Sequence, residues 1–326
     1  MEGSFILSTN RDGYRKILVT GGNGLVGSAL RAIASEYPGR EFHFVGSKDC
    51  DLTRADAVLK MVGQLKPDAI IHLAAVCGGI GLSMKYPAKV LRDNVLMDIN
   101  VLDAARACGV RKTVMSLSTG MYPAKVENPI LEEYIHEGTP HPSNYSYSFA
   151  KRLVDPLIRA YRAEHGMNVI GLIPNGIFGE NNNYRDDYST MLPALIRRFY
   201  ENRNGGGDIV IWGDGKPLRE FTYGKDMARA YMWCLDHYDG EQALHIGTTE
   251  EHSVGDIAYM IADYMGIDRR RVKFDTTKPA GQFRKSTDNT KFLKLSNFSY
   301  TKFEDALKAT IDWFCSHYGD GQTLRI

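Results

Sequence analysis

The chain has 326 residues, of which 43% are hydrophobic and 24% are charged, the balance of an ordinary globular protein that can bury a large core. Its 40 Lys and Arg residues nearly cancel its 39 Asp and Glu residues, so the formal charge of +1 predicts neither a nucleic-acid partner nor an anionic membrane surface. No apolar run is long enough for a membrane span, and five widely spaced cysteines indicate neither a disulfide framework nor a metal site, which predicts a cytoplasmic protein.

Residues 1–14 are predicted to form a flexible leader. Their one apolar run, Phe5-Ile6-Leu7, is too short for the core of a signal peptide. Chain ends are commonly poorly ordered unless they pack against the domain.

From residue 15 onward, short apolar runs alternate with helix-like stretches. The predicted strands occupy residues 16–20, 41–46, 69–75, 112–118 and 168–174. The predicted helices follow them, at 28–37, around 54–65, and near 87–108 and 145–165. This alternation predicts an α/β fold with a Rossmann-like, doubly wound parallel sheet.

Beyond Pro174 the pattern becomes rich in loops, with further helices predicted at 190–201, 225–237, 254–265 and 303–317. We therefore expect a Rossmann domain over 15–178 and a smaller, mainly substrate-binding α/β domain over 179–326. Two strand candidates, 209–213 and 243–247, leave this boundary open, because either could return to the main sheet.

A glycine-rich turn lies between the first strand and the first helix, the context that a dinucleotide-binding motif requires. Gly21 would allow the tight turn, Gly24 would let the backbone approach a pyrophosphate, and Gly27 would let helix and strand pack closely. Asn23, Leu25 and Val26 complete this predicted cofactor-binding turn, whose helix N-terminus attracts phosphate.

The end of the second strand decides between NAD and NADP, because an acidic side chain there binds ribose hydroxyls and repels a 2′-phosphate. Here the strand ends in Gly46-Ser47-Lys48, and the first carboxylate is Asp49. Ser47 and Lys48 favour NADP(H), although Lys48 alone is also explained as a solvated turn residue. Asp51 and Leu52 are predicted to lie beneath the adenine.

Tyr147 and Lys151 are four residues apart, which places them on one face of a helix. A lysine ammonium beside a phenol is expected to lower the phenol pKa toward neutrality, so that the phenol exchanges a proton with a carbonyl oxygen. Ser118 ends the fourth strand and would hydrogen-bond the same carbonyl. Ser116 is a weaker alternative, since it lies deeper on the same strand face.

These motifs resemble the extended short-chain dehydrogenase/reductases that act on nucleotide sugars, and in finer detail the GDP-L-fucose synthase family. The resemblance covers residue 15 to the C-terminus. Its segments are LAAVCGGIG (73–81), LSTGMYP (117–123), PHPSNYSYSFAK (140–151), IPNGIFGENNN (173–183), MLPALIRRF (191–199), WGDGKPLREFTYGKDMA (212–228) and DTTKPAGQFRKSTDNTK (275–291).

The resemblance implies a reductive triad of Ser118, Tyr147 and Lys151, an NADP(H) cofactor, and a GDP-linked 4-keto sugar as substrate. Further cofactor contacts are expected from Leu73, Ala74, Ala75, Asn94, Pro174 and Asn175. Substrate contacts are expected from Thr119, Gly120, His141, Asn175, Thr190, Arg198, Trp212, Arg219 and Lys285. The resemblance also implies a homodimer in which the helices near 87–108 and 145–165 form a four-helix bundle.

The chain departs from the family at two positions. Members that invert C3 and C5 of the sugar carry a cysteine where this chain has Gly120 and a histidine where it has Thr190. Glycine has no proton to give, and a threonine hydroxyl is too weak a base near neutrality. The sequence therefore predicts a C4 reductase that lacks epimerase activity, acting on a GDP-4-keto 6-deoxyhexose or heptose.

Three alternatives remain open from the sequence. Cys77 and His141 could replace the missing epimerase pair. The fold could instead serve an NAD-dependent nucleotide-sugar 4-dehydrogenase or epimerase. A non-catalytic NADP sensor is the third alternative, although such a protein has no need of Ser118, Tyr147 and Lys151 together.

Overall fold

The structure, a computed structural model, describes residues 13–78, 80–185, 189–278, 283–321 and 324. Its largest element is a six-stranded parallel sheet in the order β2-β1-β3-β4-β5-β9. These strands are β1 (Lys16–Thr20), β2 (Glu41–Val45), β3 (Ala69–His72), β4 (Lys112–Ser116), β5 (Val169–Pro174) and β9 (Leu244–Ile246). The Rossmann-like fold expected from the sequence is confirmed.

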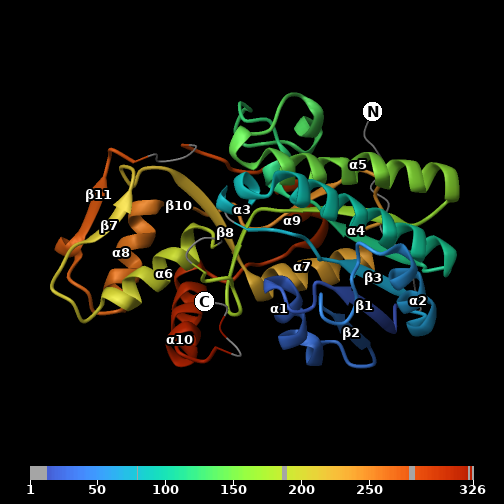
Figure 1. Cartoon of the computed structure of the whole chain (residues 1–326), viewed down its shortest axis with the longest axis horizontal. Coiled ribbons are helices and arrows are strands. Elements are labelled where there is room, and N and C mark those ends of the chain that lie inside the picture. Colours follow the sequence, from blue (N-terminus) through green and yellow to red (C-terminus); the bar gives the residue numbers. More distant parts are fainter. Residues whose placement is uncertain (1–12, 79, 186–188, 279–282, 322–323, 325–326) are drawn as a thin grey trace.

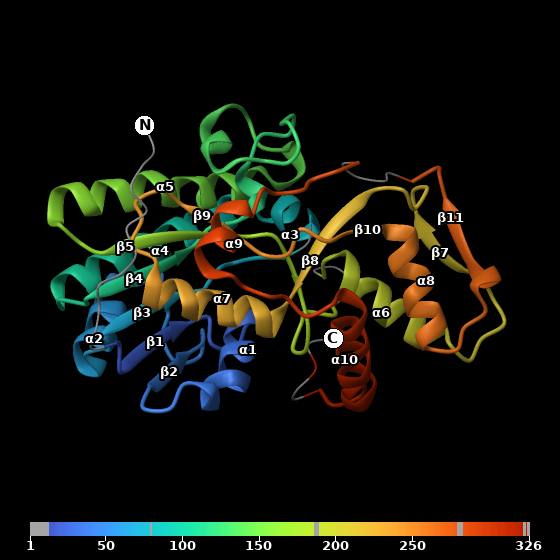
Figure 2. The ribbon, with the colours of Figure 1, turned by 180° about the vertical axis from the view of Figure 1, so that it is seen from behind.

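Helices cover both faces of this sheet (Figures 1 and 2). Alternate residues of β1 point to opposite faces, so that Ile17 and Val19 pack in one core cluster and Leu18 in another. The first cluster involves α1 (Leu25–Ile33) and α7 (Gly224–His237), and the second α2 (Ala55–Leu65) and α4 (Pro87–Ala107). The long helix α5 (Tyr145–His165) runs beside α4.

The remaining strands form two small sheets. β10 (Glu251–Ser253), β8 (Leu218–Tyr223) and β6 (Gly176–Phe178) make one, and β7 (Ile209–Trp212) pairs with β11 (Val272–Asp275) in the other. Of the two strand candidates left open by the sequence, 243–247 therefore returns to the large sheet as β9, whereas 209–213 does not.

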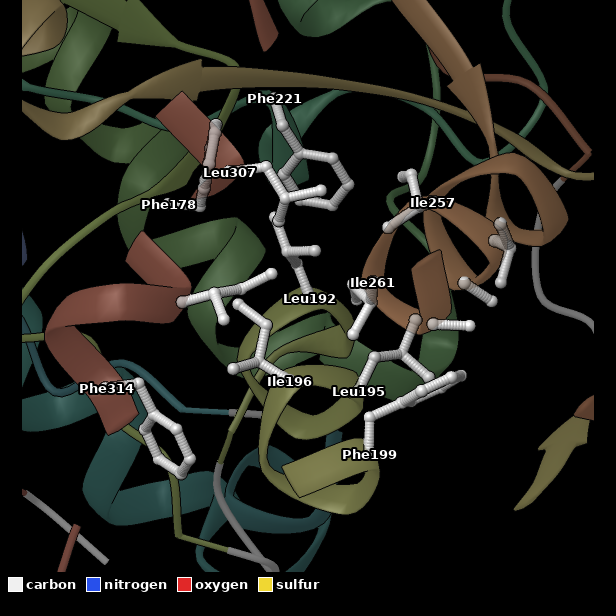
Figure 3. Packing of buried hydrophobic residues seen from close by; sticks show 14 of the residues in the cluster. Phe178, Leu192, Leu195, Ile196, Phe199, Phe221, Ile257, Ile261, Leu307 and Phe314 are labelled. Atoms are coloured by element: carbon white, nitrogen blue, oxygen red, sulfur yellow. The ribbon is translucent and has the colours of Figure 1, made fainter. Parts of the chain in front are cut away.

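Around these small sheets a separate apolar core forms between α6 (Met191–Asn202), α8 (Val254–Tyr264) and α10 (Phe303–His317). Figure 3 shows how Leu192 and Ile196 of α6 meet Ile261 of α8 in this core. The predicted helices at 190–201, 254–265 and 303–317 coincide closely with these three helices.

Shorter elements complete the chain. They are the helices α3 (Ile80–Lys85) and α9 (Thr290–Ser296) and the 3-10 helices η1 (Ala34–Glu36), η2 (Thr119–Met121), η3 (Glu132–His136), η4 (Pro142–Asn144) and η5 (Arg269–Arg271).

Most of the predicted leader, residues 1–12, lies outside the described residues, and Tyr14 at its end is buried in the core. Within the described part of the chain, none of the helices combines the length and the apolar character needed to cross a bilayer.

Candidate active site

A cavity of about 460 Å³ opens at the carboxyl ends of the strands, between the glycine turn, the loop after β3, the start of α5 and the segment after β5. Because β1 connects to β2 on one side and pairs with β3 on the other, this edge is the topological switch point at which doubly wound sheets bind ligands. Of the residues predicted for the site, the cavity is lined by Gly21, Gly24, Leu25, Val26, Gly27, Leu73, Ala75, Ser118, Thr119, Tyr147, Lys151, Pro174, Asn175 and Thr190.

The glycine turn has the geometry of a phosphate cradle. Gly21 has a φ of +68°, and a Cβ on it would lie 2.7 Å from the Ala74 nitrogen, so only glycine fits. Gly24 forms the N-cap of α1 without any side-chain cap, which leaves the first N–H groups of this helix available to an anion. The residues present therefore fit a dinucleotide cofactor.

The residues predicted to bind the adenine end of the cofactor do not line this cavity. Ser47 and Lys48 are exposed on the turn after β2, while the Asp49 carboxylate folds back to accept a hydrogen bond of 2.8 Å from the Gly46 nitrogen. The side-chain amide of Asn23 lies against Gly46: a Cβ added to Gly46 would be 2.4 Å from Asn23 Nδ2. Asp51 is exposed, and buried Leu52 accepts a hydrogen bond from Asn100 at its carbonyl.

Asn94 has its amide fully used inside the protein. It accepts from the Val76 nitrogen at 3.0 Å and donates to the carbonyl oxygens of Val76 and Val90. Its side chain is completely buried and holds the loop after β3 in place. Asn94 therefore supports the cofactor site only indirectly, through this loop.

Ser118, Tyr147 and Lys151 converge at the cavity. Ser118 caps η2 by accepting a hydrogen bond from the Gly120 nitrogen at 3.1 Å, and its hydroxyl also reaches the Tyr147 phenol. The phenol is hydrogen-bonded to Cys77 as well, which lies on the loop after β3 and lines the cavity. Ser116 is engaged elsewhere, with its hydroxyl 2.6 Å from the Tyr231 hydroxyl.

The expected lowering of the Tyr147 pKa is wrong, because this pKa is raised in the structure. Burial raises the pKa of the phenol well above its ordinary value, and Cys77 and Asp98 add to the rise against the hydrogen bond from Ser118. The Lys151 ammonium lies 3.5 Å from the Asp98 carboxylate. A phenol of this kind is protonated near neutral pH, which suits a proton donor.

A buried polar chain that the sequence pattern does not predict lies next to Lys151. It runs from Thr20 through His72 to Asp98, all of which are 1% exposed or less. His72 ends β3, inside the strand predicted at 69–75, and Asp98 lies inside the helix predicted near 87–108; neither was predicted as a site residue. A polar residue within an otherwise apolar strand was the signal that could have drawn attention to His72.

Asn175 lies between the cavity and a buried carboxylate. It donates to Glu220 at 3.2 Å and to the Thr248 carbonyl at 2.7 Å, and accepts from Thr222 at 2.7 Å. Glu220 accepts further hydrogen bonds from the Thr287 nitrogen and hydroxyl. Burial nevertheless raises the pKa of Glu220 from 4.5 to about 7, because no cation pairs with it among the described residues.

This shift predicts a pH-dependent stability that replacement of Glu220 removes. A carboxyl whose pKa is higher in the folded state loses stability as pH rises from 4.5 to about 7. Relative to the wild type, Glu220→Gln is therefore expected to gain about 1–3 kcal/mol in free energy of unfolding between pH 5 and pH 8. Urea unfolding at both pH values measures this change. Glu133→Gln, on an exposed side chain, controls for the substitution itself. The burial argument would be contradicted if the free energy of unfolding of Glu220→Gln relative to the wild type were the same at pH 5 and pH 8.

Two of the predicted substrate residues come together as a pair of like charges. Burial and, to a lesser extent, the nearby Arg219 together lower the pKa of Lys285 to about 8. Burial also lowers the pKa of Arg219. No carboxylate among the described residues forms an ion pair with either side chain, so the pair is suited to an anionic group.

The other predicted substrate residues lie apart from the cavity lining. Arg198 of α6 donates to the Val210 carbonyl at 2.7 Å, and Trp212 at the end of β7 is 60% exposed. His141 is exposed, caps η4 and is hydrogen-bonded to Ser143, so it does not join Cys77 in the cavity. Gly120 lies next to Ser118: a Cβ added to Gly120 would be 3.3 Å from the Ser118 hydroxyl oxygen.

Comparisons with known proteins place this geometry in context. A family model described as the NAD dependent epimerase/dehydratase family matches residues 17–247. A GDP-L-fucose synthase of Dictyostelium discoideum is 36% identical over 315 residues, which cover 95% of this chain and 98% of that protein. A solved GDP-L-fucose synthetase of Naegleria fowleri, bound to NADP, matches with a TM-score of 0.89 at 36% identity and covers 98% of this chain and 100% of the other. A GDP-mannoheptose C4 reductase of Campylobacter jejuni, solved with NADP bound, shares the fold with a TM-score of 0.82 at 24% identity, over 92% of this chain and 98% of the other.

Proposed function

Since the chain belongs to the NAD dependent epimerase/dehydratase family and, within it, to the GDP-L-fucose synthase family, we propose that it reduces the C4 carbonyl of a GDP-linked 4-keto sugar with NADPH. The sugar is a 6-deoxyhexose or a heptose, and C3 and C5 are not inverted. One observation carries this proposal. Ser118, Tyr147 and Lys151 meet at one cavity, whereas the positions of the epimerase pair hold Gly120 and Thr190.

The chain offers a site for each part of the cofactor. The glycine turn and the N-terminus of α1 would hold the pyrophosphate, and Ser47 and Lys48, both exposed after β2, would bind the 2′-phosphate. Lys151 would bind the ribose next to the nicotinamide. When bound, NADPH supplies the hydride for C4.

The side chains around the carbonyl supply orientation and a proton. The Ser118 hydroxyl would donate a hydrogen bond to the carbonyl oxygen, and the Tyr147 phenol would transfer its proton to that oxygen as negative charge develops there. Burial raises the pKa of the phenol, so the phenol holds the proton that this step requires.

The rest of the substrate would lie toward the smaller sheets. The diphosphate would be bound by Arg219 and Lys285, which are half-buried and have no carboxylate partner among the described residues. The proposal includes a homodimer through α4 and α5, which expose the apolar residues Leu91 and Leu153.

Loss of epimerisation follows from the two replaced residues. Gly120 presents no acid or base, and Thr190, at the N-cap of α6, presents to the cavity a hydroxyl that is too weak a base. Cys77 supports the competing proposal of a substitute epimerase residue, because it lines the cavity next to Tyr147. Its thiol has no partner histidine in the described cavity lining, and loss of solvation in the cavity raises its pKa, so the thiol holds its proton near neutral pH and is not available as a base.

Turnover of GDP-4-keto-6-deoxymannose with NADPH in D₂O tests the proposal. We expect oxidation of NADPH at 340 nm and a product that contains no deuterium at C3 or C5 by mass spectrometry and NMR. A GDP-L-fucose synthase that carries the cysteine and histidine provides the positive control for exchange. Two deuterons in the product would overturn the loss of epimerisation, and their disappearance in Cys77→Ser would then assign it to Cys77.

A further inference from the structure

Lys151 is held from behind by a residue that does not line the cavity. Its ammonium lies 3.5 Å from Oδ1 of Asp98, with 2% of the lysine side chain and 1% of the aspartate side chain exposed. Asp98 lies on α4, and α4 runs beside α5, which carries Lys151 and Tyr147 (Figure 1). The charge that Lys151 presents to the active site is therefore shared with a buried carboxylate.

A chain of hydrogen bonds holds this carboxylate in place. The Ala74 nitrogen donates to Thr20 Oγ1 at 3.4 Å, and this hydroxyl is 2.7 Å from His72 Nδ1. Because a carboxylate oxygen accepts, the imidazole donates from Nε2 to Asp98 Oδ1 at 3.0 Å. Asp98 thus accepts from both His72 and Lys151 at one oxygen, while its other oxygen makes no hydrogen bond within the described residues.

We propose that Asp98, oriented by His72, is a positioning residue that offsets the charge of Lys151 and so opposes ionisation of Tyr147, the proton donor in the reduction. This inference rests on the proposed function, because only a reductase needs the phenol as an acid. The proton moves from the Tyr147 oxygen to the oxygen at C4 as that oxygen accepts the electron pair of the carbonyl bond, and the phenol is left as a phenolate. Asp98 itself transfers no proton in this step.

The groups that face Tyr147 are consistent with Asp98 raising the pKa of the phenol. Lys151 comes from the same helix, Cys77 from the loop after β3, and Ser118 from the end of β4. Asp98 approaches from α4, with His72 of β3 behind it. Lys151 is the one lysine or arginine in this group of described residues. Burial first, then Cys77, and also the charge of Asp98 raise the pKa of Tyr147.

Replacing Asp98 by asparagine removes this negative charge and leaves Lys151 unopposed. The phenol should then ionise more readily, so the loss of reductase activity at high pH should begin about one pH unit or more below that of the wild type. The phenol is also titrated directly, without substrate or cofactor, from the ultraviolet difference between each protein and its Tyr147→Phe counterpart. This second readout gives a result even if the protein does not reduce a GDP-4-keto sugar, so failure of the proposed function is distinguishable from failure of this inference.

Asp93→Asn is the matched control. Asp93 lies on the same helix, is similarly buried, and pairs with Lys89 and Arg92 instead of Lys151. We expect its pH profile and phenol titration to match the wild type. If Asp98→Asn does not fold, the pair Asp98→Glu and Asp98→Gln compares the presence and absence of charge at equal size, and the glutamate variant should hold the higher phenol pKa.

A purely structural role for Asp98 gives a different result. In that case Asp98→Asn would weaken NADPH binding, measured by tryptophan fluorescence, or lower kcat equally at every pH, and would leave the phenol titration unchanged. Either outcome without a shift of the phenol would overturn the inference.

Discussion

Tyr147→Phe is expected to lower kcat for reduction of a GDP-4-keto sugar by about 10²–10⁴-fold, the usual contribution of a positioned general acid. The change removes the phenolic proton and keeps the ring that packs at the cavity. Ser118 remains as a hydrogen-bond donor to the carbonyl, but a serine hydroxyl is too weak an acid to replace the phenol. The dissociation constant of NADPH, measured by tryptophan fluorescence, should change little.

The neighbouring Tyr145 provides a matched control. It lies two residues earlier on α5, is 53% exposed and packs against Phe149, and it does not line the cavity. Tyr145→Phe should therefore retain the wild-type kcat. A Tyr147→Phe variant with more than about a tenth of the wild-type kcat would show that another group protonates the oxygen, and Cys77 would be the first to test.

Gly27→Ala is expected to weaken NADP(H) binding by about 10- to 100-fold. A Cβ at this position would lie 2.4 Å from the Gly21 oxygen and 2.7 Å from the Gly22 Cα atom. Both atoms belong to the backbone of the phosphate-binding turn, so the turn must move to make room, at a cost of about 1–3 kcal/mol. Fluorescence titration with NADP measures the affinity, and thermal unfolding measures the accompanying loss of stability.

Gly63→Ala separates this clash from a general effect of the substitution. Gly63 lies inside α2, where an added Cβ meets nothing closer than the Cys108 sulfur at 3.8 Å. This variant should bind NADP as the wild type does and should be slightly more stable, since alanine is the better helix former. Normal NADP affinity in Gly27→Ala would contradict the assignment of the glycine turn as the pyrophosphate site.

Several parts of the site could be predicted from local pattern. A parallel sheet brings the carboxyl ends of its strands to one edge, so the glycine turn after β1 and Ser118 after β4 had to lie near each other once the strands were recognised. The spacing of Tyr147 and Lys151 placed both on one face of a helix. These inferences depend on periodicity and on chain order alone.

Other predicted contacts required distances that no local pattern contains. Asn94 has the residue type of a ligand-binding side chain, but its amide is used entirely to hold the loop after β3. His141 precedes the catalytic helix in the sequence, yet it is exposed and caps η4. In both cases the residue type is compatible with the expected role, but the hydrogen bonds that the side chain forms within the protein are not.

The sequence by itself determined the fold class, the glycine turn and the convergence of Ser118, Tyr147 and Lys151 on the cavity, because these follow from the order of strands and helices along the chain. The tertiary structure alone decided the electrostatics of the site. Burial reversed the expected shift of the Tyr147 pKa, placed Asp98 against Lys151, and brought Arg219 beside Lys285. The physical reason is that a pKa depends on solvent exclusion and on charges within a few ångströms, and those charges come from segments far apart in the chain.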